Sequence, residues 1–230
     1  LGASSDIGLE LVNKFLQNNW QVHAHYNNNK TNLFNIKSKN KDLKLFKLNL
    51  FTKFNNIDKK IINLRLNNFS SYINLVGALD SKSFKDSNYQ DQIKILSANT
   101  LYPLHILKTI LPSMIKNKFG RILNCSSIGV KFGGGINNYN YSLSKHLMEF
   151  IPSESKKWSI NNVLINNLRI GVTKTKLHSK INNKNLKERI KLIPIGRMAN
   201  TTEISEFIFY LSTENNSFIT NETLSIAGGE

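Results

Sequence analysis

Three side chains that lie close together in the sequence, Ser127, Tyr141 and Lys145, could together carry out proton transfer. Tyr141 and Lys145 are four residues apart, a spacing that places two side chains on the same face of a helix. A free phenol has a pKa of about 10, and a neighbouring ammonium lowers that pKa toward the working range. A serine hydroxyl can hold a carbonyl oxygen that gains negative charge. The pattern therefore indicates acid–base chemistry at a carbonyl group.

A strand, a loop and a helix must bring these side chains together. The apolar run at residues 121–125 predicts a buried strand that ends at Ser127, and a loop with three consecutive glycines follows it. A helical pattern then begins near Asn138 and carries the tyrosine and the lysine. Tyr26 and Lys30 have the same spacing, but they follow no strand that ends in serine. The spacing alone is common in a lysine-rich chain, so the surroundings of each pair must decide.

The composition indicates one ordinary α/β domain. The 230 residues suffice for a single domain with a sizeable core, over residues 1–230, and no apolar run approaches the about 20 residues that a membrane span needs. The single cysteine, Cys125, lies inside the predicted strand, where we interpret it as a core residue rather than a nucleophile. A chain that cannot form an internal disulfide suits the reducing cytoplasm. The five histidines show no metal-ligand spacing, so no metal site is predicted.

The net charge of +16 and the isoelectric point of about 9.9 are unusual. Such a charge could attract nucleic acid, an anionic membrane surface or an acidic protein. The lysines are mixed with asparagines along the chain and form no long block, so we interpret the charge as a compositional bias of solvated faces. A non-catalytic basic binding protein is the alternative, but it lacks the clustered arginines and stacking aromatics of a dedicated nucleic-acid binder.

A glycine-containing turn opens the sequence. Gly2 and Gly8 bracket a short polar stretch before an amphipathic helix at residues 7–18, and the N-terminus of such a helix can bind a phosphate. No strand precedes the turn, so we expect an N-terminally truncated chain that lacks its first strand and could fail to bind a cofactor for that reason. Asp6 would repel a pyrophosphate if it faced one, so its carboxylate must point away or weaken binding.

Strands and helices alternate along the rest of the chain. This predicts a three-layer, doubly wound α/β fold with a mostly parallel sheet. The predicted strands are 20–26, 44–50 and 162–168, with a last strand at 223–227, and residues 71–78 predict another strand and a turn at Gly77. The predicted helices are 53–67, 88–116 and 202–212. Pro103 should kink the long helix, and Asn99 on it either faces solvent or fixes a water near the reacting centre. Residues 172–187 are expected to form a flexible lid over the substrate.

The loop after the strand at 20–26 meets the adenosine ribose of a dinucleotide in such a fold. An acid there favours NAD, whereas a basic or small polar residue suits the extra phosphate of NADP. No acidic residue occurs between His23 and Lys41, whereas the basic residue Lys30 lies in this stretch. The sequence therefore favours NADPH over NADH.

Taken in order, these motifs make the chain resemble the short-chain dehydrogenase/reductase family along essentially its whole length. The TGxxxGxG turn of that family corresponds to residues 1–8 (LGASSDIG), its NNAG turn to 74–77 (NLVG), and its PGxxxT segment to 170–175 (IGVTKT), where the proline is lost. The helix and GG ending match at Glu203 and 228–229. The family's catalytic residues fall on Asn99, Ser127, Tyr141 and Lys145.

The resemblance implies nicotinamide-dependent hydride transfer between a ketone and a secondary alcohol. Tyr141 would protonate the forming alkoxide, and Lys145 would lower its pKa and hold the nicotinamide ribose. Ser127, rather than Ser126, would bond to the carbonyl oxygen, and Asn99 would help a water relay the proton. The predicted cofactor-binding residues are Gly2, Ser4, Ile7, Gly8, Lys30, Asn49, Asn74, Gly77, Tyr141, Lys145, Thr173 and Thr175.

Within the family, the chain is similar to β-ketoacyl carrier-protein reductases and to sugar and polyol dehydrogenases. Of two basic positions with which those reductases dock an acidic carrier protein, one aligns with Lys118 and the other with Asn161. The expected partners are therefore a small ketone or alcohol, free or bound to a carrier protein, and further copies of the chain in a dimer or tetramer formed through the long helices.

Overall fold

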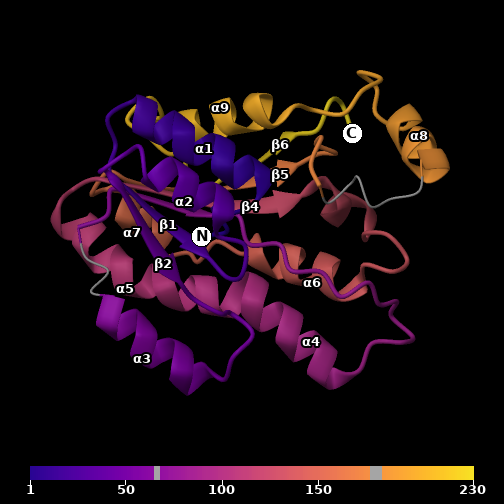
Figure 1. The fold of residues 1–230 in the computed structure, drawn as a ribbon, viewed down its shortest axis with the longest axis horizontal. Helices are drawn as coiled ribbons and strands as arrows, with labels where there is room; N and C mark the ends of the chain where they lie inside the picture. The colour runs from indigo at the N-terminus through magenta and orange to yellow at the C-terminus, as the bar shows by residue number, and fades with distance from the viewer. Residues whose placement is uncertain (65–67, 177–182) are drawn as a thin grey trace.

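The computed structural model describes residues 1–64, 68–176 and 183–230, and within these ranges the paired strands are parallel (Figure 1). They form one sheet of two strands and one of four: β1 (Val22–Tyr26) and β2 (Leu43–Lys47), then β3 (Ser71–Asn74), β4 (Gly120–Ser127), β5 (Val163–Ile170) and β6 (Thr223–Ile226). The first residues lie between the two sheets, because Ala3 N–H donates to His25 O at 3.0 Å and Leu75 N–H donates to Leu1 O at 3.1 Å. The predicted α/β class is confirmed, whereas a strand before Leu1 stays a prediction.

Helices cover both faces of the sheets, which gives the expected three layers (Figure 1). One face carries α1 (Asp6–Gln17), α2 (Thr31–Lys37) and α9 (Thr201–Leu211). The other carries α3 (Phe54–Leu64), α4 (Tyr89–Leu96), α5 (Tyr102–Lys116) and α6 (Tyr139–Met148). Two further α-helices are α7 (Ser155–Ser159) and α8 (Asn183–Lys191), and a 3₁₀ helix, η2 (Ile128–Phe132), follows β4.

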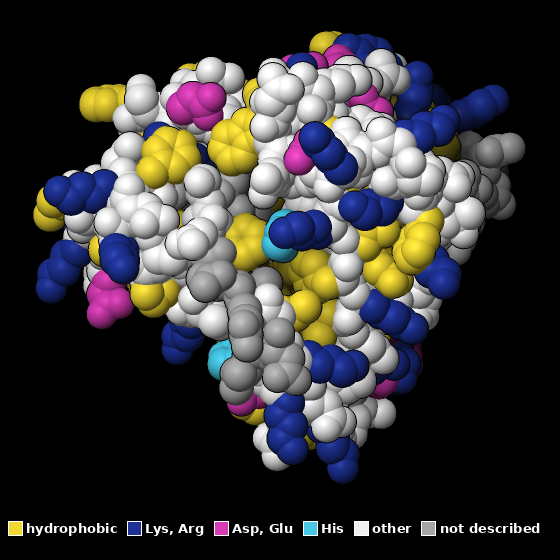
Figure 2. All heavy atoms as spheres, turned by 60° about the vertical axis from the view of Figure 1, so that its left-hand side comes forward, with side chains coloured by type: hydrophobic (Ala, Val, Ile, Leu, Met, Phe, Trp, Pro, Cys, Tyr) yellow, Lys and Arg dark blue, Asp and Glu magenta, His cyan; other side chains and the backbone are white. Residues whose placement is uncertain are grey.

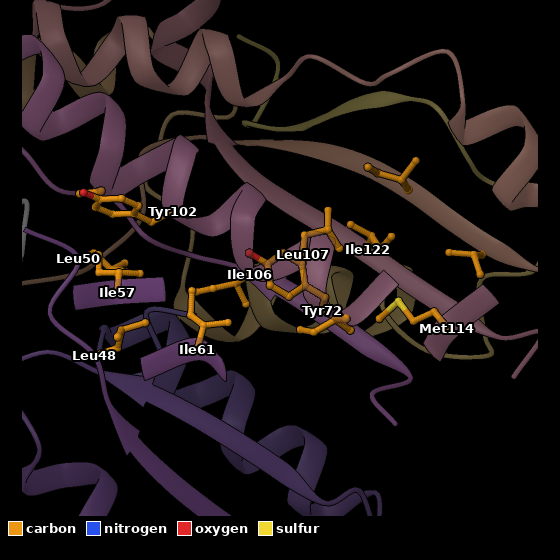
Figure 3. Packing of buried hydrophobic residues seen from close by; sticks show 14 residues of the cluster. Leu48, Leu50, Ile57, Ile61, Tyr72, Tyr102, Ile106, Leu107, Met114 and Ile122 are labelled. Carbon is orange, nitrogen blue, oxygen red and sulfur yellow. The ribbon is translucent and has the colours of Figure 1, made fainter. Parts of the chain in front are cut away.

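The core is divided by the alternation of side chains along β4. Ile122 packs with residues of α3 and α5 on one face, whereas Leu123 and Cys125 pack with α1 and α9 on the other. Figure 3 shows the first of these clusters, with Ile106 and Met114 of α5 lying against the sheet. Burial of each such side chain contributes roughly 1.5–3 kcal/mol. Cys125 is therefore a core residue, as predicted, and burial raises the pKa of its thiol to about 12.

The long helix is interrupted where no proline stands. A π-helical turn, η1 (Ser97–Leu101), separates α4 from α5, and Pro103 lies in the first turn of α5, where a proline is tolerated. The expected kink at Pro103 is therefore replaced by a π turn just before it. Because proline has no N–H, the carbonyl of Asn99 lacks its α-helical donor, and it accepts a hydrogen bond from Asn74 Nδ2 at 3.3 Å instead.

The segment predicted as a lid is partly helical. Its first residues are anchored, since Thr173 pairs with Ala199 and Lys174 N–H donates to Ala199 O at 2.9 Å. Residues 177–182 of the predicted lid lie outside the described residues, and α8 forms where the sequence suggested a polar loop. Good helix formers such as Lys187 and Glu188 favour a helix at α8, although the polar composition of this segment suggests a loop.

Two surface findings bear on the expected partners. No helix in the described ranges is long and apolar enough to cross a membrane. Figure 2 shows the lysine and arginine side chains spread over one face of the molecule, with neutral and apolar side chains between them. That face therefore carries dispersed rather than clustered positive charge, in line with a compositional bias.

Candidate active site

The carboxyl ends of the parallel strands bring the predicted catalytic residues to one edge. Asn74 at the end of β3 pairs with Asn124, and Ser127 at the end of β4 pairs with Ile170 at the end of β5. The loop through Gly77 and the segment from Gly171 therefore leave the sheet beside Ser127. In open α/β sheets this edge is where ligands bind.

Tyr141 and Ser127 meet at this edge. Tyr141 lies in the first turn of α6, and its phenol lies close enough to the Ser127 side chain for that hydroxyl to lower its pKa. The Ser127 oxygen also accepts a hydrogen bond from Gly129 N–H at 3.2 Å, which leaves the hydroxyl proton free to point toward the phenol. The geometry required by the sequence prediction, a serine hydroxyl beside the tyrosine hydroxyl, is therefore present.

The pKa of Tyr141 differs in direction from the expectation. Burial, the larger cause, raises it above the ordinary phenol value, and the hydrogen bond with Ser127 opposes that shift. The expected lowering by Lys145 is absent, since the Lys145 ammonium lies 5.7 Å from the centre of the Tyr141 ring and is engaged elsewhere. At neutral pH Tyr141 is therefore a protonated phenol.

Lys145 is held by backbone carbonyls beneath the tyrosine. Its Nζ donates to Val76 O at 2.6 Å and to Cys125 O at 2.7 Å, and the residue is only 3% exposed. Burial lowers the pKa of this ammonium to about 8, because a charge is poorly solvated there. Gly77 lies directly against the pair, since a Cβ added to it would stand 3.6 Å from Tyr141 Cε2 and 3.9 Å from Lys145 Cε.

Asn99 is a structural centre of the site. It is fully buried, so the solvent-facing alternative is wrong. Its Oδ1 accepts from Ala78 N–H at 2.7 Å, and its Nδ2 donates to Ala78 O at 3.0 Å and to Ser144 Oγ at 2.8 Å. The side chain thus ties the π turn to the loop after β3 and to α6. A water relay through Asn99 stays a prediction.

The glycine turn forms a close-packed cradle at the start of α1. Gly2 has a φ of 74°, and a Cβ on it would approach Leu75 C to 2.9 Å, while a Cβ on Gly8 would approach Ala3 Cα to 2.7 Å. Ser5, which the sequence analysis did not single out, is the N-cap of α1: its Oγ accepts from Gly8 N–H at 3.0 Å. A serine two residues before a helical pattern is the signal that could have identified it.

Asp6 has a partner within the protein. Its Oδ2 accepts a hydrogen bond from the backbone N–H of Lys176 at 2.6 Å, which ties the glycine turn to the segment after β5. This contact favours the alternative in which the carboxylate is turned away from a phosphate.

The other predicted cofactor residues fall into two groups. Asn74 and Thr173 are buried, and their side chains hold the backbone: Asn74 Oδ1 accepts from Val76 N–H at 3.1 Å, and Thr173 Oγ1 donates to Gly171 O at 3.0 Å. The remaining side chains are half-buried or exposed near the edge: Ser4, Ile7, Lys30, Asn49 and Thr175.

The second tyrosine–lysine pair with a spacing of four, Tyr26 and Lys30, does not share a helix face, because Tyr26 ends β1 and Lys30 precedes α2.

His25 was missed as a site residue. It is buried in β1, its Nδ1 accepts from Gly2 N–H at 3.0 Å, and its Nε2 bonds to Leu48 O at 2.8 Å. Burial, the largest cause, lowers the pKa of the ring to about 4, so His25 is neutral at pH 7. The ring links the glycine turn to the end of β2, next to Asn49. A histidine in a strand carries no sequence signal for such a role.

The residues at this edge fit a nicotinamide dinucleotide. The capped N-terminus of α1 favours a diphosphate, and the two glycines keep that approach free of side chains. Asn27, at the end of β1, has a buried Oδ1 without a hydrogen-bond partner in the described structure, and a ribose hydroxyl is the kind of donor that it lacks. Among the described residues, no group of three or more His, Cys, Asp or Glu could hold a metal ion.

Comparison with known proteins agrees with this arrangement. Residues 2–230 match the family model described as enoyl-(acyl carrier protein) reductase. With the fold and the Ser–Tyr–Lys geometry in place, the chain belongs to the short-chain dehydrogenase/reductase family.

Curated relatives are similar over part of the chain. The 3-oxoacyl-(acyl-carrier-protein) reductase FabG of Aquifex aeolicus (strain VF5) is 30% identical over 158 residues, which cover 68% of this chain and 63% of that protein. Acetoacetyl-CoA reductase of Acinetobacter sp. (strain RA3849) is 29% identical over 159 residues, 68% of this chain and 63% of the relative. The chain thus spans less than two thirds of the length of these relatives.

Solved structures share the fold. A 3-oxoacyl (acyl-carrier-protein) reductase from Agrobacterium tumefaciens C58 with NADP bound has a TM-score of 0.85 at 19% identity, covering 100% of this chain and 92% of that one. A 4-hydroxyisoleucine dehydrogenase complexed with NADH has a TM-score of 0.86 at 23% identity, covering 99% and 95%.

Proposed function

We propose that this protein is an NADPH-dependent reductase that interconverts a ketone and a secondary alcohol, with Tyr141 as the acid and base. The observation that carries the proposal is the approach of the Tyr141 phenol to the Ser127 hydroxyl at the carboxyl edge of the sheet, above the buried ammonium of Lys145. This set provides a proton donor, a hydrogen-bond donor for the substrate oxygen and a fixed positive charge at one edge of the sheet.

The division of work follows from the environments of the three groups. The cofactor, when bound, supplies the hydride. Ser127 donates a hydrogen bond to the substrate oxygen, where negative charge develops. Tyr141, whose pKa is raised by burial, stays protonated at neutral pH and can give its proton to the alkoxide. After the transfer, the Ser127 hydroxyl can donate to the phenolate that remains, while the ammonium of Lys145 stays bound to its two carbonyl partners.

NADPH is the cofactor that the adenosine end favours. Lys30 precedes α2 with an exposed side chain, its Nζ lies 5.1 Å from the centre of the Phe34 ring, and no acid stands near it in sequence. A cation at this loop suits a ribose phosphate. One of the two structural neighbours was solved with NADP and the other with NADH, so they do not favour either cofactor. The preference for NADPH therefore rests on the positive charge of Lys30. A cytoplasmic location, where nicotinamide pools are available, is part of the proposal.

A β-ketoacyl thioester, free or on an acidic carrier protein, is the substrate class that we propose first. Support comes from the names of the curated relatives, a 3-oxoacyl-(acyl-carrier-protein) reductase and an acetoacetyl-CoA reductase. The positive net charge of the chain suits an acidic carrier. Lys118, on the exposed turn after α5, is the candidate docking cation.

Self-assembly through the long helices is also part of the proposal. Apolar side chains remain exposed on the outer faces of α4, α5, α6 and the adjoining turns: Ile93, Leu101, Leu104, Leu143, Leu147 and Phe150. Exposed apolar side chains that form a contiguous patch commonly mark an interface, and these residues are the candidates for one. Light scattering on the purified full-length protein should give a dimer or tetramer, and a monomer at micromolar concentration would exclude it.

Substrate screening tests the reductase proposal. We expect oxidation of NADPH, followed by its absorbance, with acetoacetyl-CoA and with a panel that includes cyclic ketones and oxidised sugars. Activity with the thioesters above the others supports the first substrate class, and activity only with sugars or cyclic ketones replaces it. Consumption of neither NADPH nor NADH with any ketone, by full-length protein that binds NADPH, would refute the reductase proposal.

A further inference from the structure

A hydrogen-bonded network behind the catalytic pair joins the end of α6 to β4 and β5. Its centre is Glu149, the residue that caps the C-terminus of α6, with a side chain that is 9% exposed. The Glu149 carboxylate accepts from Arg169 Nε at 2.9 Å and from Arg169 Nη2 at 2.7 Å. It also accepts from the Ser126 hydroxyl at 2.7 Å. One carboxylate on the helix therefore binds side chains from two adjacent strands.

Backbone groups at the end of α6 take part in the same network. Glu149 O accepts from Asn167 Nδ2 on β5 at 2.7 Å, and the Ser126 hydroxyl lies 3.3 Å from Lys145 O. Asn167 is fully buried and its Oδ1 accepts from Asn124 Nδ2 on β4 at 3.3 Å. The last turn of α6 is thus bonded to β4 and β5 both by a side chain and by its own carbonyls.

The network lies next to Ser127, Tyr141 and Lys145. Glu149 follows Lys145 by one helical turn and Tyr141 by two, and Ser126 precedes Ser127 with its side chain on the opposite face of β4. It therefore connects the helix that carries the phenol to the strand that carries the serine. The distance between these two groups depends on how α6 sits on β4 and β5, and a displacement of about 1 Å at a catalytic group can cost about 10²-fold in rate.

Stability alone is a weak explanation for this ion pair. The cost of desolvating a mostly buried pair offsets much of its Coulombic attraction. Its bidentate geometry, however, fixes the orientation of the two side chains relative to each other. We propose that Glu149, Arg169 and Ser126 are positioning residues that set the spacing between Tyr141 and Ser127. The proposal rests on the reductase function proposed above and assigns these three residues no contact with substrate or cofactor.

Glu149→Gln tests the proposal, because glutamine keeps the size of the side chain and removes the charge that orients Arg169. With NADPH and the best ketone, we expect kcat to fall by about tenfold or more, while the KM for NADPH stays within about twofold of wild type. Glu206→Gln is the matched control, since it breaks the ion pair between Lys14 of α1 and Glu206 of α9 on the other face. That variant should keep the wild-type kcat.

Two further variants keep the test decisive. Ser126→Ala removes one hydrogen bond from Glu149 and leaves the ion pair, so it should fold even if Glu149→Gln does not, and kcat should fall several-fold. Arg169→Lys keeps a cation and should recover part of the activity that Arg169→Ala loses. Wild-type kcat in both Glu149→Gln and Ser126→Ala, or a fall in kcat matched by an equal rise in the KM for NADPH, would overturn the positioning role.

The ionisation of Tyr141 separates a failure of this inference from a failure of the proposed function. The tyrosinate absorbance, titrated with Tyr141→Phe as the reference, reports on the phenol without any substrate. A weakened hydrogen bond with Ser127 should shift this ionisation to higher pH in Glu149→Gln, while Lys145 is unchanged. If the wild type reduces no ketone, the reductase proposal fails but the titration still tests the network. An identical titration in Glu149→Gln and wild type would refute the network.

Discussion

Replacing Lys145 by methionine should change how the stability of the protein depends on pH. Lys145 is 3% exposed, and burial lowers the pKa of its ammonium from 10.5 to about 8. Methionine keeps an unbranched side chain of similar length and removes the titrating group. The comparison therefore isolates the proton equilibrium of one buried lysine beside the Tyr141 phenol.

The magnitude follows from the two pKa values. The gap between 10.5 and about 8 corresponds to about 3 kcal/mol, at about 1.36 kcal/mol per pH unit. Below pH 8 the lysine is charged in the folded and the unfolded chain, so the folded state bears the whole cost of burying the charge. Between about pH 8 and 10.5 the unfolded chain binds more protons than the folded one, so this site adds stability as the pH rises.

Urea unfolding of the wild type and Lys145→Met, at a series of pH values across that window, measures the effect. The unfolding free energy of the wild type relative to the variant should rise by about 3 kcal/mol from neutral pH to above the unfolded pKa. The carbonyls of Val76 and Cys125, left without the ammonium, change the difference by a constant and leave its pH dependence intact. A difference that stays flat with pH would refute the assignment of Lys145 as a buried, shifted cation.

Three further substitutions test other parts of the site. Ser127→Ala should lower kcat by about 10²- to 10³-fold. Because Ser127 lowers the pKa of Tyr141, the pH profile of alcohol oxidation should also move to higher pH in this variant. An unmoved profile would show that Ser127 does not influence the ionisation of Tyr141. Lys30→Glu should lower the ratio of kcat/KM for NADPH to that for NADH by about tenfold or more, measured with one ketone; an unchanged ratio would exclude Lys30 from cofactor choice. His25→Phe leaves Gly2 N–H and Leu48 O unpaired and should lower the unfolding free energy by about 1–3 kcal/mol, whereas the exposed control His23→Phe should change it by less than about 0.5 kcal/mol; equal effects would contradict the bridging role.

The elements that the sequence predicted well are those with a strong periodic pattern. The strand that ends at Ser127 and the helix that carries Tyr141 lie where the apolar run and the helical spacing put them. The alternation of strands and helices was sufficient for the α/β class, because each buried parallel strand reads as a short apolar run. Shorter elements such as α2 and α7 have too few residues to show a period and were not predicted.

The features that the sequence could not give depend on contacts between distant residues. The π turn carrying Asn99 is fixed by Ala78 and Ser144, which are remote in sequence, so a local rule placed the irregularity at Pro103 instead. The direction of the Tyr141 pKa shift depends on burial, which outweighs the helical neighbour Lys145. Glu149 and Arg169 are twenty residues apart and form a pair only when β5 is placed beside β4.

The proton-transfer role of Tyr141 is tested most directly by Tyr141→Phe. Phenylalanine keeps the ring that packs beside Gly77 and removes only the hydroxyl whose pKa Ser127 lowers. We predict that kcat for ketone reduction falls by about 10²- to 10⁴-fold, while the dissociation constant for NADPH, measured by fluorescence titration, stays within about twofold. A variant that keeps more than a tenth of the wild-type kcat would contradict this account of the site.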